Sequence, residues 1–354
     1  MKTSFCVLLG LGIMAGISCQ DPGPFGNGPL RMEKPEKVLY MDCDRTFVHV
    51  FPEVLQCTDL QIVADSVLVC QDYVGENNGD FFKTYSLRTF RFLGSFGRKG
   101  RGPNEFLFPN MTRGNPDAEV LYLNDNPMER VYEIDVLGAL RGDPDFVIRT
   151  GRLPDGVADW MPLTGTSCLN LKPTPQEFVL QYADWEGNVR KAFSLYTDAA
   201  TDLAPVQLSS VLVSNGKTGQ AAILMVCFPQ LLLTSPEGEI FRAVAVDKAA
   251  RKWKVILENP FGMDAMQYYS GAAATKDHII ASYRGLSLGD VLEGGHGGSV
   301  QIFDWDGNYR YEVRIAEDIG PIAFDSVSRY LYALERGSGR IVRYDFSGIL
   351  AASE

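Results

Sequence analysis

The chain has 354 residues, of which 45% are hydrophobic and 22% charged, a composition typical of globular proteins and unlike that of disordered chains. Its 44 acidic and 33 basic residues give a net charge of −11, which argues against non-specific nucleic-acid binding because that requires neutralisation of phosphates. The length suits either two domains of average size or one large repeat fold.

Residues 1–18 have the pattern of a signal peptide. Lys2 supplies a positive start, and the apolar stretch 5–17 is too short to span a bilayer comfortably. Ser18 precedes Cys19, which indicates a lipoprotein signal ending at an acylated cysteine, although Gly16 replaces the larger aliphatic residue that is usual there. An ordinary signal peptide with a chance cysteine is the alternative. Residues 19–35 are rich in proline and glycine, and we expect a flexible tether.

Five further cysteines follow, and none of them forms a CxxC pair of the kind used in redox or zinc sites. They are Cys43, Cys57, Cys70, Cys168 and Cys227. Cys70 and Cys227 lie in apolar, strand-like runs, so we expect buried thiols there. The sequence leaves open a disulfide between Cys43 and Cys57.

The segment Gly97–Phe106 reads Gly-Arg-Lys-Gly-Arg-Gly-Pro-Asn-Glu-Phe and combines three cations with three glycines and a proline. Such a composition predicts a tight loop with projecting cationic side chains, here between two β-elements. The segment resembles the loop after the first blade in six-bladed β-propeller lipoproteins of the Bacteroidetes, relatives of NHL and TolB-type propellers. In that family the loop reads Gly-Arg-x-Gly-x-Gly-Pro-x-Glu-Phe. The resemblance implies a propeller fold in the cell envelope and says little about activity.

A β-rich run ending in aspartate recurs about every fifty residues. The copies lie at 132–135, 193–198, 243–247, 300–304 and 341–345, with a degenerate copy at 84–88. A second short apolar run precedes each copy, and turn residues separate the two in most units. Six units of this size match four-stranded antiparallel blades. We therefore predict an all-β, six-bladed β-propeller that occupies residues 36–350 as one domain.

The predicted blades cover residues 54–97, 104–150, 157–210, 219–258, 266–316 and 319–349. Two strand-like runs, 38–40 and 47–50, precede the first blade, and we expect both to pair with the last blade and close the ring. Seven blades, with residues 36–53 contributing to an extra unit, is the alternative.

Propeller topology predicts that the loop 97–106 and the long glycine-rich connection 284–298 of the fifth blade open onto the same face. We expect this face to bind a ligand, because concave sites edged by a few polar groups commonly do. The candidate ligand-binding residues are Arg98, Lys99, Arg101, Asn104, Glu105, Tyr283, Arg284 and His296.

Structural roles compete with recognition at several of these positions. The three cations could pair with carboxylates of neighbouring blades, Glu105 could bond loop amides, and His296 could simply be solvated. Phe106 is expected in the core. Asp184-Trp185 and Asp304-Trp305 lie near predicted turns, where packing and turn capping account for them.

Two classes of function fit the sequence. The favoured one is a non-catalytic, monomeric, lipid-anchored propeller that binds a protein, peptide or glycan fragment, with no nucleic-acid partner. It would be an outer-membrane lipoprotein facing the periplasm or the surface. The alternative is a metal-assisted lyase or hydrolase using the same face. His49, His278 and His296 are far apart, so we assign no metal ligands and no cofactor, leaving calcium near the central channel open. The Gly-x-Ser-x-Gly pattern of the serine-hydrolase elbow occurs at 285–289, whereas the phosphate-binding loop of P-loop form is absent from the sequence.

Overall fold

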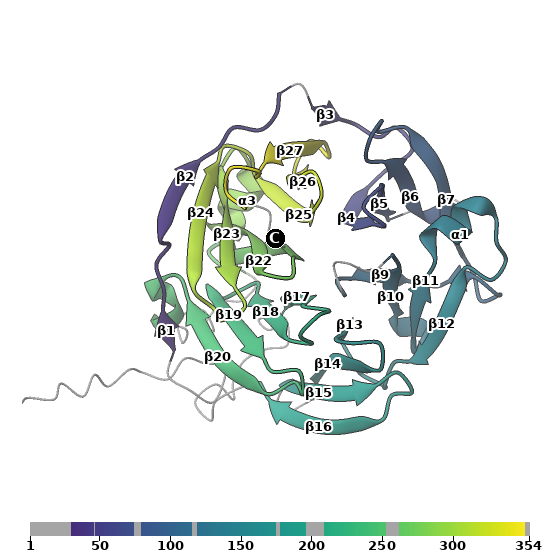
Figure 1. Ribbon diagram of the computed structural model, residues 1–354. Coiled ribbons are helices and arrows are strands. Elements are labelled where there is room, and N and C mark those ends of the chain that lie inside the picture. The colour runs from purple at the N-terminus through teal and green to yellow at the C-terminus, as the bar shows by residue number, and fades with distance from the viewer. Residues whose placement is uncertain are drawn as a thin grey trace, which may run out of the picture.

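The computed structural model describes residues 30–45, 47–73, 79–114, 119–174, 178–195, 209–252 and 262–350. These residues form six small, mainly antiparallel sheets arranged as a ring, which confirms the six-bladed propeller and excludes the seven-bladed alternative (Figure 1). In each blade the strands follow one another from the central axis to the rim. Among the described residues, no helix has both the length and the apolar character needed to cross a bilayer.

The first three blades are continuous in sequence. From axis to rim, blade 1 contains β4 (Cys57–Val63), β5 (Val67–Asp72), β6 (Asp80–Ser86), β7 (Phe92–Lys99) and the short β8 (Glu105–Phe106). Blade 2 contains β9 (Pro109–Thr112), β10 (Leu121–Asp125), β11 (Arg130–Ile134) and β12 (Val147–Arg152), with the 3-10 turn η1 (Asn126–Met128) and helix α1 (Val136–Arg141) in its connections. Blade 3 contains β13 (Asp159–Pro162), β14 (Ser167–Pro173), β15 (Phe178–Asp184) and β16 (Val189–Ser194).

The last three blades each receive an outer strand from the start of the chain. Blade 4 contains β17 (Ser210–Ser214), β18 (Ala221–Met225), β19 (Gln230–Thr234), β20 (Ile240–Ala245) and the outer β1 (Arg31–Met32), followed by η4 (Lys248–Lys252). Blade 5 contains β21 (Met266–Ala274), β22 (His278–Ser287), helix α3 (Leu288–Glu293), β23 (Gly298–Asp304), β24 (Tyr309–Ile315) and the outer β2 (Lys37–Tyr40). Blade 6 contains β25 (Ile319–Phe324), β26 (Tyr330–Glu335), β27 (Ile341–Asp345) and the outer β3 (Val48–His49).

Residues 30–50, the N-terminal rim segment, run along the outside of blades 4, 5 and 6 (Figure 1). β1 and β2 pair in parallel with β20 and β24, and β3 pairs antiparallel with β27. The prediction that 47–50 closes the last blade is confirmed, whereas the expected pairing of 38–40 with that blade is wrong because β2 joins blade 5. Leu30, which lies in the range 19–35 that the sequence suggests is a tether, is only 2% exposed and packs in an apolar cluster with residues of blades 3 and 4.

The boundary between blades 3 and 4 also differs from the sequence prediction. β17 is the innermost strand of blade 4, so this blade begins at Ser210 and not at 219. The error arises from the recurring aspartate that was used to locate the blades. This aspartate ends or follows the third strand in blades 2, 5 and 6, but in blade 4 Asp247 follows β20, the fourth strand.

Hydrogen bonds between blades supplement the apolar packing. The Gln71 side chain of blade 1 donates to the Pro109 carbonyl at 2.8 Å and accepts from the Met111 amide at 2.9 Å. Thr112 of blade 2 donates to the Trp160 carbonyl of blade 3 at 2.5 Å. These bonds satisfy buried polar groups that would otherwise destabilise the seams between blades.

The turn after the third strand has the same construction in blades 3 and 5. Asp184 accepts hydrogen bonds from the backbone and side-chain nitrogens of Asn188, and Asp304 does the same with Asn308. The tryptophans that follow these aspartates are buried. The expected roles in turn capping and packing are therefore confirmed.

Among the described residues, Cys43, Cys57, Cys70 and Cys168 are free thiols. Cys70 and Cys227 are buried, as predicted. Cys43 lies beside Glu317, and burial raises the pKa of its thiol to about 11. Cys57 instead lies beside Cys70 on the neighbouring strand. This arrangement gives no support to a Cys43–Cys57 disulfide.

Candidate functional site

The candidate site lies on the face where the first strand of each blade begins and the second strand ends, which we call the entry face. Because neighbouring strands alternate in direction, connections from the fourth strand to the next blade and from the second to the third strand share this face. Loop 97–106 is a connection of the first kind, and residues 288–297, with helix α3, form one of the second kind. The expected placement of both on one face is therefore confirmed.

The loop 97–106 is held by its own residues. The Glu105 carboxylate accepts a hydrogen bond from the Gly102 amide at 2.7 Å, and a Cβ on Gly100 would overlap the same carboxylate. Gly97 has a φ of +84°, and a Cβ there would lie 2.7 Å from Phe82. Phe106 is fully buried. The structural roles considered for Glu105 and Phe106 are thus the observed ones.

Arg98, Lys99 and Arg101 are exposed. Within the described ranges none of the three forms an ion pair, so locking of blades through carboxylates is not observed there. Asn104 has a left-handed φ of +61° and donates to the Pro144 carbonyl of blade 2 at 2.5 Å. Asn104 therefore anchors the loop, while the three cations project into solvent.

Exposed apolar side chains lie at the same end of blade 1 as these cations. Leu55 is 80% exposed, and Tyr73 and Phe108 are each 42% exposed. The rings of Tyr73 and Phe108 meet edge to face at 5.2 Å, and the Tyr73 amide bonds the Gln56 carbonyl, next to Leu55. We call the set Leu55, Tyr73, Arg98, Lys99, Arg101 and Phe108 the blade-1 patch.

Two buried aspartates at the ends of second strands fix the backbone under this patch. Asp72 accepts from the amides of Leu55 and Gln56 at 3.2 and 2.8 Å. Asp125 accepts from the amides of residues 107 and 108 at 2.7 and 3.2 Å. The backbone that carries Leu55 and Phe108 is thus held by hydrogen bonds, and no sequence pattern marks either aspartate for this role.

Tyr283 and Arg284, the predicted site residues on β22 of blade 5, pack against neighbouring residues and do not project into solvent as the cations of loop 97–106 do. Arg284 has a side chain only 4% exposed and pairs with Asp318 at 2.9 Å, tying this connection to the segment before β25. Tyr283 packs against Tyr268 and Tyr269 at ring distances of 5.8 and 5.3 Å. Blade 6 separates this group from the blade-1 patch, so the structure does not unite the predicted residues in one site (Figure 1).

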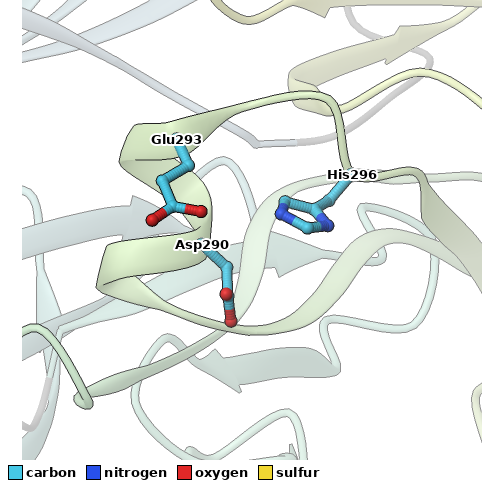
Figure 2. Close-up of side chains that lie close together, drawn as sticks. All are labelled: Asp290, Glu293 and His296. Carbon is cyan, nitrogen blue, oxygen red and sulfur yellow. The ribbon is translucent and has the colours of Figure 1, made fainter.

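His296 is exposed and lies beside two carboxylates of α3. Figure 2 shows the side chains of Asp290, Glu293 and His296 gathered on one side of the helix, with ligand atoms all within 4.8 Å of one another. Asp290 also completes a capping box with Ser287 at the start of the helix. The sequence signal for this cluster is the Asp-x-x-Glu-x-x-His spacing, which a search for paired histidines and cysteines does not detect.

A group of charged residues near the central axis, Asp59, Arg113 and Asp159, was not predicted from the sequence. Arg113 of blade 2 donates to both carboxylate oxygens of Asp59 in blade 1, with the Nη1–Oδ2 distance at 3.0 Å. Burial raises the pKa of Asp59 and raises that of Asp159 in blade 3 to about 7; the Arg113 charge opposes both shifts. Asp159 lines a hollow of ≈ 390 Å³ on the entry face between blades 2, 3 and 4. These residues are scattered in sequence, so only the ring topology brings them together.

A smaller cavity of ≈ 70 Å³ lies where first strands end and second strands begin, at the opposite end of the blades. Its polar lining includes Gln61, Arg113 and Tyr122. The side-chain nitrogen of Gln61 is buried and has no hydrogen-bond partner in the part of the chain that the structure describes. The cavity is small enough for a few ordered waters to fill it.

Comparison with known proteins identifies the fold and no family. No family model and no curated protein matches the chain. A DUF4221 family member from Bacteroides vulgatus superposes with a TM-score of 0.54 at 11% identity, covering 87% of this chain and 95% of its own. A protein from Bacteroides fragilis whose name describes it as exported gives a TM-score of 0.51 at 10% identity, covering 89% and 98%. Kuenenia stuttgartiensis hydrazine synthase gives 0.51 at 13% identity, covering 86% and 82%. At such identities the likeness extends to the propeller fold alone.

Proposed function

We propose that this protein is a non-catalytic binding module of the cell envelope whose blade-1 patch docks an acidic, partly apolar peptide segment of a partner protein. The observation that carries the proposal is that one end of blade 1 presents three exposed cations, which form no ion pair with described residues, together with three exposed apolar side chains. The exported neighbour and the sequence of residues 1–19 support an envelope location, with lipid on Cys19, which lies outside the described residues.

Charge argues for an anionic partner. The chain carries a net charge of −11, so a local group of three exposed cations contrasts with the charge of the chain as a whole. Arginine offers a planar fork that binds carboxylates in bidentate fashion, and such charge-assisted hydrogen bonds contribute about 1.5–3 kcal/mol each. A carboxylate-rich partner would be attracted here and repelled elsewhere, which provides orientation as well as affinity.

The apolar members argue for a peptide with large side chains. Covering Leu55, Tyr73 and Phe108 removes apolar surface from water at about 25 cal/mol per Å². Aromatic and arginine side chains are also the types enriched where interfaces concentrate their binding energy. The neighbouring backbone is already held by Asp72 and Asp125, so ordering costs on binding are small.

The test uses a labelled synthetic peptide of alternating glutamate and phenylalanine, with binding measured by fluorescence anisotropy. The double variant Arg98→Gln/Arg101→Gln should weaken binding by about tenfold or more per lost charged bond and leave the melting temperature unchanged. The matched control is Arg88→Gln/Arg91→Gln, which removes the same charge from exposed positions at the opposite end of blade 1.

Equal losses in the two double variants would show that net charge, and not the patch, governs binding. A melting temperature that falls with Arg98→Gln/Arg101→Gln would show a structural role for these arginines. Preference for a neutral oligosaccharide over the peptide would also overturn the proposal. Among the described residues, the metal-assisted alternative is supported by the cluster at α3, and that observation concerns metal binding and not catalysis.

A further inference from the structure

We propose that Asp290, Glu293 and His296 bind a divalent transition-metal ion, with Zn²⁺ the best match to the ligand set. This inference concerns the second-to-third-strand connection of blade 5 and is independent of peptide binding at blade 1. Two carboxylates and one imidazole are among the ligands that zinc takes in proteins. Three protein ligands leave a fourth position open to water or to a group from another molecule.

The local sequence explains why the three side chains converge. Asp290 and Glu293 are three residues apart on α3 and so lie on the same side of the helix. Gly294 and Gly295 follow with φ values of +75° and +79°, a backbone conformation that other residues rarely adopt. This pair of glycines turns the chain back so that His296 points toward the helix (Figure 2).

The distances require only small adjustments. Zinc binds nitrogen and oxygen at about 2.0–2.2 Å, so its ligand atoms lie about 3–4 Å from one another. The three ligand atoms here lie within 4.8 Å, and Glu293 and His296 are exposed side chains that are free to rotate. Convergence on one ion therefore needs changes of side-chain torsion and no movement of the backbone.

One ligand is already oriented. The Ser287 hydroxyl donates to Asp290 Oδ2 at 2.7 Å and the Ser287 amide donates to the same oxygen at 3.3 Å. This leaves Oδ1 for a metal, with Ser287 acting as the outer group that fixes a ligating carboxylate. Helix capping accounts for Asp290 without a metal, but it does not account for Glu293 or His296. Within the described part of the chain neither Glu293 nor His296 forms a hydrogen bond or an ion pair, although the ligand atoms of both lie within 4.8 Å of that of Asp290.

The imidazole ligand distinguishes the ion. Calcium and magnesium prefer sites built from oxygen, whereas imidazole favours zinc, copper, nickel and iron. The expected selectivity is therefore Zn²⁺ over Mg²⁺ and Ca²⁺.

The experiment is calorimetric titration of the chelator-treated full chain with Zn²⁺, and with Co²⁺ as a spectroscopic probe. Wild type should bind one Zn²⁺ at micromolar concentration, and the Co²⁺ complex should show the visible absorption of a low-coordinate site. His296→Ala and Glu293→Gln should each weaken binding by about tenfold or more. Gly294→Ala/Gly295→Ala keeps all three ligands but disfavours the turn, and it should weaken binding too.

The control is His278→Gln, which removes another histidine of blade 5 outside the cluster and should leave Zn²⁺ affinity unchanged. The proposal fails if wild type binds less than one Zn²⁺ at micromolar concentration. It also fails if His296→Ala binds as tightly as wild type, or if His278→Gln loses as much affinity as His296→Ala. Peptide binding at blade 1 can succeed or fail separately, so the two proposals are distinguishable.

Discussion

Phe47 is the residue through which closure of the ring can be tested most directly. It is 4% exposed and lies between the last blade and the first. Its ring meets Phe90 of blade 1 at 4.4 Å and Tyr332 of blade 6 at 5.7 Å, both edge to face. The Arg343 guanidinium lies 4.5 Å from the ring centroid. Phe47→Ala would therefore remove contacts to both sides of the closing seam.

The expected cost follows from these contacts. Truncation of a buried phenylalanine to alanine lowers the free energy of unfolding by about 3–5 kcal/mol, including the cavity left behind. Aromatic pairs and a cation over the ring each add about 0.5–1.5 kcal/mol beyond area burial, so the upper half of that range is expected. Phe47→Leu keeps most of the volume and should cost about 1–2 kcal/mol.

Urea unfolding followed by tryptophan fluorescence measures these differences. Val50→Ala serves as the control, because Val50 is 64% exposed and its truncation should change stability by no more than about 0.5 kcal/mol. A loss below about 1 kcal/mol for Phe47→Ala, or one equal to that of Val50→Ala, would refute the assignment of this segment as the closure of the ring.

Two further predictions concern pH and anchoring. Burial raises the pKa of Asp159 to about 7, above the value near 4 of an unfolded chain, so the folded state binds this proton more tightly and stability falls as pH rises between the two values. Asp159→Asn should therefore gain stability relative to wild type from about pH 4 to about pH 7 and keep that gain above it; a difference in unfolding free energy that does not change with pH would contradict this. Cys19→Ala should move the protein from the membrane to the soluble fraction on cell fractionation, because stable anchoring requires several acyl chains; membrane retention of a cleaved variant would rule out Cys19 as the anchor.

Much of the architecture could be predicted because blades repeat. Each blade must alternate strands with turns, and this leaves apolar runs and turn residues at regular spacing. The predicted blade boundaries were less accurate because the recurring aspartate occurs at two different positions in a blade, after the third strand or after the fourth. An aspartate after a strand caps a turn equally well after the third strand, as Asp304 does, or after the fourth, as at Asp247 in blade 4. Spacing alone cannot distinguish these cases.

The N-terminal rim segment shows a second limit. A strand such as Lys37–Tyr40 has no sequence feature that specifies which of six similar rims it joins. Its partner is set by chain direction and reach, since β1, β2 and β3 visit blades 4, 5 and 6 in turn. The run 47–50 was easier to place, because closing the ring requires one strand beside the last blade.

The candidate site was predictable only where it is local in sequence. The loop 97–106 carries its turn chemistry and its exposed cations within ten residues, so composition reveals both. Arg284 was predicted to be available for ligand binding in the same way. Its side chain is instead buried and paired with Asp318 in the next connection, and the sequence does not reveal this pairing. The pairing of Asp59 with Arg113 depends likewise on contact between two blades.

The N-terminal rim segment also sets an order for assembly during synthesis. The residues that form β1, β2 and β3 leave the ribosome before any blade exists, yet their partners β20, β24 and β27 belong to the second half of the chain. Val48 cannot form its strand pairing until Val342, which belongs to the last blade, has been synthesised. Blades 1 to 3 can form from neighbouring strands as they emerge, whereas the ring closes only when β27 of blade 6 pairs with β3. Contacts so distant in sequence form slowly, and an unfinished ring exposes an unpaired strand edge. A nascent chain of this protein therefore stays dependent on protection from aggregation until blade 6 has been made.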